Sequence, residues 1–134
     1  MIRNERTRQL VLTYFAIAVG GTLGCWARYA MTNLVQAVYG RDFPYATLSI
    51  NLLGSFLMGF LFIVTLERMT MSPALRTGIL TGVLGGYTTY STFEMETLLL
   101  IEQGEPFKAA LYVILSVIMG FIAAFAGAYI ARNL

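Results

Sequence analysis

The residues best suited to chemistry in this 134-residue chain are polar side chains that stand inside long apolar runs. Asn51 has apolar neighbours on both sides, and its amide offers two donors and one acceptor. We expect Asn51 either to form a hydrogen bond between two helices or to bind an anion through its NH₂ group. Ser116 lies in another apolar run. Its hydroxyl either bonds back to its own helix or is available to a ligand.

The stretch from Gly85 to Phe93 (GGYTTYSTF) is a poor centre for a helix, because two adjacent glycines precede β-branched and hydroxyl residues. A broken helix there would expose carbonyls that suit a cation at the end of its first half. It would also expose N–H groups that suit an anion at the start of its second half. The alternative is a kinked helix whose Ser and Thr hydroxyls bond back to the chain. We expect the broken helix with an ion site.

Aromatic and charged residues near these positions have two interpretations each. Tyr90 and Phe93 share a helical face, so they either pack together or present their positive ring edges to a small anion. Arg28 follows a full-length apolar run and marks either the membrane boundary or a vestibule that attracts anions. Glu94 and Glu96 follow the unusual stretch. A carboxylate within a membrane is a functional candidate, and here it keeps a proton-coupled exporter in consideration.

The composition excludes several classes of protein. Hydrophobic residues make up 57% of the chain, against 9 Lys+Arg and 7 Asp+Glu, with one Cys and no His. One Cys and no His exclude a disulfide scaffold, a Cys/His zinc site and a His-dependent triad. A net charge of +2 is too small to indicate a surface that binds nucleic acid. No nucleophile–base pair is visible, so we do not expect an enzyme.

Four uncharged runs, of 17 to 24 residues each, match the roughly 20 residues that span a bilayer as a helix. We therefore predict one all-α integral membrane domain, residues 1–134, with four transmembrane helices in contact with lipid and the third broken near the middle of the membrane. Four helices form a thin bundle with little wall around a pathway, which favours a homo-oligomer, most simply a twofold dimer. The predicted helices cover about residues 9–33, 44–67, 73–102 and 107–132.

Small residues recur at a spacing of four on each predicted helix, and such rows let helices in lipid approach closely. We expect them to be packing faces. The rows are Gly20 and Gly24; Ser55 and Gly59; Gly78, Gly82 and Gly86; Gly120 and Ala124; and Ala123 and Gly127.

Three motifs, in order along the chain, resemble those of the Fluc (CrcB) family of fluoride ion channels. The GGYTTYSTF stretch resembles the family's G-G-x-T-T-[FY]-S-T-F. The segment from Asn51 to Gly59 resembles its N-x-x-G-x-x-x-x-G, and that from Gly20 to Tyr29 its G-G-x-x-G-x-x-x-R-[WY]. The resemblance covers nearly the whole chain.

The resemblance implies an antiparallel dual-topology homodimer with two fluoride pores and a structural sodium ion at its centre. It implies that the dimer passively releases fluoride across the cytoplasmic (inner) membrane of a prokaryote and so protects it from fluoride. The residue roles that follow are sodium carbonyls at Gly85 and Thr88, a pore of Asn51, Thr89, Tyr90, Phe93 and Ser116, a vestibule with Arg28, and an acidic residue after the break at Glu96.

This chain departs from the family pattern at two places. Tyr90 stands where many relatives have Phe, and Gly120 stands where relatives can carry Ser. The rival functions are a proton-coupled small multidrug-type exporter and a structural or regulatory membrane subunit. The exporter typically needs a carboxylate in the first membrane helix, and the first apolar run here has none.

Overall fold

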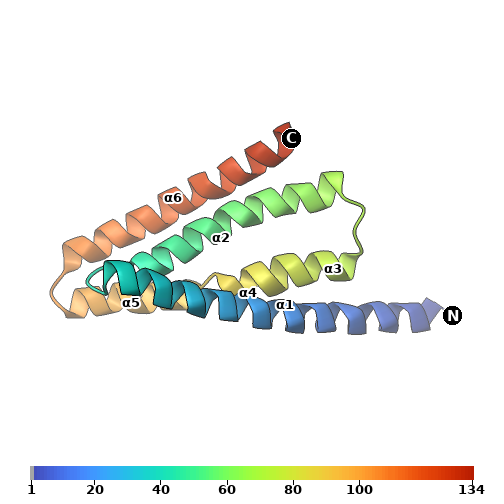
Figure 1. Ribbon diagram of the computed structural model, residues 1–134, viewed down its shortest axis with the longest axis horizontal. Helices are drawn as coiled ribbons and strands as arrows, with labels where there is room; N and C mark the ends of the chain where they lie inside the picture. The colour runs from blue at the N-terminus through green and yellow to red at the C-terminus, as the bar shows by residue number, and fades with distance from the viewer. Residues whose placement is uncertain (1) are drawn as a thin grey trace.

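A computed structural model describes the backbone of residues 2–134 and the side-chain environments from residue 4 onward. Within these residues the chain is helical and contains no strand. The helices run back and forth along one long axis, and both termini lie toward the same end (Figure 1). In chain order they are α1 (Ile2–Tyr39), α2 (Tyr45–Ile63), the π-helical η1 (Val64–Arg68), α3 (Pro73–Thr77), the π-helical η2 (Gly78–Leu84), α4 (Gly85–Tyr87), α5 (Tyr90–Glu102) and α6 (Pro106–Asn133).

Three helices of the described chain are long and apolar enough to cross a membrane: Asn4–Tyr39, Tyr45–Arg68 and Pro106–Asn133. They correspond to the first, second and fourth predicted spans. The first helix extends beyond its predicted range of 9–33 at both ends. The third predicted span is divided into shorter pieces by an interruption, so a fourth crossing stays a prediction.

The interruption lies at Thr88 and Thr89, where the backbone is extended, with φ/ψ of −78°/159° and −151°/118°. Two extended residues exclude the kinked helix. The break lies further along the chain than the glycine pair suggested, because Gly85 and Gly86 are still helical in α4. Glycine content alone therefore does not set its position.

The glycine rows of α1 and η2, each of which the spacing predicted to be a packing face, pack against each other. A Cβ at Gly20 would overlap the Gly78 carbonyl oxygen, and one at Gly24 would overlap the Val83 carbonyl oxygen. A Cβ at Gly86 would meet the Gly21 carbonyl oxygen at 2.7 Å. Backbone therefore contacts backbone from η2 through α4, and α1 holds the first half of the broken segment in place.

Helices α2 and α6 run side by side (Figure 1), and their small residues make a second close contact. A Cβ at Gly59 would overlap the Ala124 carbonyl oxygen, and one at Gly127 would overlap the Phe56 carbonyl oxygen. Because backbone atoms cannot move aside as side chains can, these glycines fix the distance between the two helices.

Replacing Gly127 by alanine should lower the stability of the protein, although alanine is better than glycine in a helix by about 1 kcal/mol. The new methyl group would overlap the α2 backbone. Gly120→Ala on the same helix is the matched control, because its Cβ would meet only the Ser55 Oγ, at 3.8 Å. Thermal unfolding in detergent should show a lower midpoint for Gly127→Ala only. Equal midpoints for the two variants would contradict the assigned contact.

The buried cluster sits where α5 and α6 meet, and most of the large apolar side chains of α1 and α6 face outward. Phe93, Leu100, Ala109 and Tyr112 form the cluster. Exposed residues include Phe121 on α6, 74% accessible in the single protomer. Outward apolar faces suit lipid or another subunit and would be costly in water.

Candidate functional site

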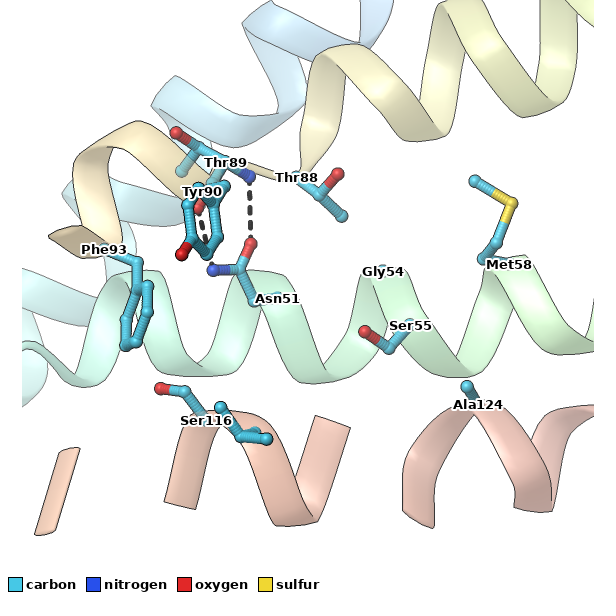
Figure 2. A pocket seen from close by; sticks show the side chains of 11 residues that line it. Asn51, Gly54, Ser55, Met58, Thr88, Thr89, Tyr90, Phe93, Ser116 and Ala124 are labelled. Carbon is cyan, nitrogen blue, oxygen red and sulfur yellow. Dashed lines mark hydrogen bonds between the residues drawn. The ribbon is translucent and has the colours of Figure 1, made fainter. Parts of the chain in front are cut away.

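Asn51 holds the broken segment through both ends of its amide group. Its Nδ2 donates to the Thr89 carbonyl oxygen at 2.9 Å, and its Oδ1 accepts from the Thr89 N–H at 2.9 Å (Figure 2). The N–H and C=O of Thr89 fix which way the amide points, since each needs the opposite partner. The predicted interhelical hydrogen bond is confirmed, and the second N–H of the NH₂ group remains for a ligand.

A cavity of about 370 Å³ lies beside this clamp, between α2, the break and α6 (Figure 2). It contains all five residues that the sequence assigned to a pore, although they come from three segments of the chain. None of the residues around it carries a charge. They are Asn51, Gly54, Ser55, Met58, Thr88, Thr89, Tyr90, Phe93, Ser116, Val117 and Ala124.

Phe93 is the central aromatic ring of the site and is only 6% exposed. The Tyr112 ring lies 5.1 Å from it at 64°, an edge-to-face arrangement, and the Tyr90 ring lies 5.7 Å away at 48°. The predicted pairing of Tyr90 with Phe93 is therefore present. Tyr90 is 74% exposed in the single protomer, so Tyr112, rather than Tyr90, buries the Phe93 ring.

The Ser116 hydroxyl has an unusual environment. Its Oγ is buried and has no hydrogen-bond partner within residues 4–134. The back-bonded interpretation of this serine is therefore wrong. A buried hydroxyl without a partner is costly, and this one belongs to a residue at the wall of the cavity (Figure 2). The arrangement leaves a donor and acceptor for something inside the cavity.

The two ends of the break present opposite backbone groups. Apart from bonds inside regular helices, no hydrogen bond in the described chain reaches the carbonyl oxygens of Gly85 or Thr88. Such carbonyls are suitable ligands for a hard cation. On the other side, α5 begins at Tyr90 beside the cavity, and the Thr89 Oγ1 accepts from the Thr92 N–H at 3.3 Å. The positive end of the α5 dipole therefore lies at the cavity wall.

Glu96 points into the protomer, where two hydroxyls donate to it. The Thr47 Oγ1 lies 2.9 Å from its Oε1, and the Tyr112 hydroxyl lies 2.7 Å from its Oε2. Glu94, by contrast, is exposed. Sequence reasoning did not single out Thr47 or Tyr112. A signal was available in the spacing. Thr47 lies four residues before Asn51, and Tyr112 lies four residues before Ser116. Residues four apart share one face of a helix, so both missed residues lie on the same face as a predicted one.

Arg28 lies at a second cavity, of about 460 Å³, which Thr89 and Glu96 also line. Helix α1 continues past Arg28 to Tyr39, so Arg28 does not end the helix. Its Nη2 is 3.6 Å from the Cys25 Sγ. Thr89 therefore lines both cavities, and the second one, unlike the first, is also lined by two ionisable side chains, Arg28 and Glu96.

Comparison with known proteins places most of the chain in the family that the three sequence motifs resemble. Residues 15–128 match the family model described as CrcB-like protein, Camphor Resistance (CrcB). A protein of Acidithiobacillus ferrooxidans named fluoride-specific ion channel FluC is 60% identical over 90% of this chain and 97% of its own length. Proteins with the same name are 46% identical in Geobacter sulfurreducens (91% of this chain, 98% of theirs) and 39% identical in Legionella pneumophila (92% of each). The chain therefore belongs to the CrcB family.

Proposed function

We propose that this protein is a fluoride-selective ion channel that lets fluoride leave the cell passively. The observation that carries the proposal is the uncharged cavity, in which the Asn51 amide and the unpartnered Ser116 hydroxyl lie near the Phe93 ring. Its relatives, which carry the name fluoride-specific ion channel, support the same ion. An ion channel is not an enzyme, in agreement with the composition.

Neutral groups suit the transport of fluoride because the ion must enter the site and also leave it. Fluoride holds its water tightly, so a pore has to replace that water with donors without forming a trap. In this cavity the donors are the free N–H of Asn51, the Ser116 hydroxyl and the polarised ring edge of Phe93. The N-terminus of α5 adds a positive potential without a mobile charge.

The proposal includes a structural sodium ion held by the carbonyls of Gly85 and Thr88, whose oxygens are open to a cation. The described residues contain no group of three acidic, Cys or His side chains that could hold a metal, and the ligands that we propose are backbone oxygens. When bound, sodium would satisfy the freed carbonyls and raise the positive potential of the site.

Removing sodium should therefore destabilise the protein. Protein exchanged into N-methyl-D-glucamine chloride should unfold in detergent at a lower temperature than protein in sodium chloride, and returning sodium should restore the midpoint. Potassium chloride at equal ionic strength is the control for salt. Identical midpoints in all three salts would contradict the sodium site.

We further propose that two protomers insert antiparallel and form a homodimer. The outward apolar faces and the incomplete wall of the cavity support a second subunit. Light scattering in detergent should give twice the protomer mass of 14.8 kDa. Tags at either terminus should be accessible from both sides of the membrane. A monomer, or one-sided access, would contradict this part of the proposal.

A fluoride electrode separates the channel from its rivals. Proteoliposomes loaded with potassium fluoride should release it when valinomycin lets potassium follow, with no proton gradient and no drug present. A proton-coupled exporter would need the gradient, and the family comparison does not support one. A structural subunit would release nothing. Release no faster than from protein-free vesicles would overturn the channel.

The biological role that follows is protection of a prokaryote from fluoride at its inner membrane. In acidic surroundings fluoride enters as neutral HF and dissociates inside, and a channel lets the anion leave down its gradient. Expression in a bacterium without its own fluoride exporter should restore growth in fluoride at low pH. Unchanged sensitivity despite membrane insertion would contradict this role.

A further inference from the structure

A row of polar residues continues along α2 beyond the residues that the proposed function uses. Thr47, Asn51 and Ser55 follow one another at a spacing of four, so they lie on one face of the helix. Thr47 donates to Glu96, and Asn51 holds Thr89. Ser55 is the third member of this row and lies at the wall of the uncharged cavity (Figure 2).

The facing row on α6 stops one residue short. Tyr112, Ser116 and Gly120 repeat at the same spacing, but Gly120 contributes no side chain. A Cβ built at Gly120 would have the Ser55 Oγ as its neighbour, at 3.8 Å. The hydroxyl at this level of the cavity therefore comes from α2, across the place where α6 carries a glycine.

The hydroxyl of Ser55 is available to a ligand. Several helical threonines in this chain bond back to the carbonyl four residues earlier, as Thr65 and Thr97 do. Within residues 4–134 the hydroxyl of Ser55 forms no hydrogen bond, and the residue is only partly buried. Ser55 thus resembles Ser116, the other serine of the cavity, whose Oγ also lacks a partner.

We propose that Ser55 is a further fluoride-binding residue of the pathway, one that supplies the hydroxyl missing from position 120. This inference rests on the proposed function, since it assigns a donor to the same fluoride path. A fluoride ion leaving the Asn51 amide and the Ser116 hydroxyl would meet the Ser55 hydroxyl one helical turn further along α2.

The test moves the hydroxyl from one helix to the other. Ser55→Ala should slow fluoride release from proteoliposomes about tenfold, the scale expected for one hydrogen bond to a charged group. Adding Gly120→Ser to Ser55→Ala should return the rate to within about threefold of wild type, since it places a hydroxyl beside the vacated position. The site has room for it, because the Cβ of residue 120 meets only ordinary contacts.

Two further variants guard against indirect effects. Ser49→Ala, on the same helix but not at the cavity, should conduct like wild type. Ser55→Cys keeps the size of the side chain with a weak donor, and should be slow while unfolding at the wild-type temperature. Slow release by Ser55→Ala that Gly120→Ser does not restore would overturn the inference.

The wild-type vesicles separate this inference from the proposed function. If wild-type protein releases no fluoride, the proposed function fails and the role of Ser55 fails with it. If wild type and Ser55→Ala release fluoride at the same rate, the channel stands and only the role of Ser55 is overturned.

Discussion

Phe93→Ile should bring fluoride release from proteoliposomes down to the rate of protein-free vesicles. Isoleucine keeps an apolar side chain at the cavity wall but has no ring, and therefore no positive edge to replace the water of an anion. Phe93 is 6% exposed and is held edge-to-face by Tyr112 at 5.1 Å. These contacts hold the Phe93 ring in one orientation at the cavity wall.

The matched control is Phe107→Ile on α6, since Phe107 is 79% exposed. That variant should release fluoride as wild type does. Both proteins should elute from gel filtration as wild type, which shows that the assembly survives. Near-normal release by a well-folded Phe93→Ile protein would show that the ions do not pass this ring, and the assigned pathway would be wrong.

Asn51→Leu should abolish fluoride release and also destabilise the protein. Leucine has a similar shape, but it leaves the N–H and C=O of Thr89 without the partners that Asn51 supplies at 2.9 Å each. An unsatisfied buried polar group costs about 1–3 kcal/mol. The break would then have no anchor on α2. Thermal unfolding and fluoride release, measured on the same preparation, should both fall.

Asn51→Asp separates the anchoring role from the binding role. A carboxylate can still accept from the Thr89 N–H, but it has no donor for the Thr89 carbonyl and adds a negative charge to an uncharged cavity. We expect partial stability and no fluoride release. Asn33→Leu, at an exposed position of α1, is the control and should change neither quantity. An Asn51→Leu protein as stable as wild type would contradict the clamp.

The break illustrates how far the sequence could be interpreted. Its existence followed from poor helix formers in an apolar segment, and the structure contains it. Its position did not follow, because Gly85 and Gly86 are helical and the chain extends only at Thr88 and Thr89. At this position Asn51 contacts Thr89 across 38 residues of sequence, and local propensity cannot reveal such a contact.

The rows of residues at a spacing of four were easier to predict from the sequence than the position of the break. Spacing of four correctly predicted that Gly20 and Gly24 form a packing face, because periodicity places residues on a helix face whatever the neighbour is. Periodicity cannot say which two faces meet. For that reason the partners of Glu96, which are Thr47 and Tyr112, appeared only in three dimensions, as did the π-helical turns of η2.

The most direct test of the central claim, passive and selective conduction of fluoride, is the reversal potential of the protein in a planar lipid bilayer. A tenfold gradient of sodium fluoride is set up at neutral pH, with sodium sulfate added so that sodium is equal on both sides. A fluoride-selective channel should give a current that reverses near 59 mV, the value for a tenfold gradient of a monovalent ion. A modest pH gradient should not move it. A reversal potential of zero, or one that follows the proton gradient, would contradict the account.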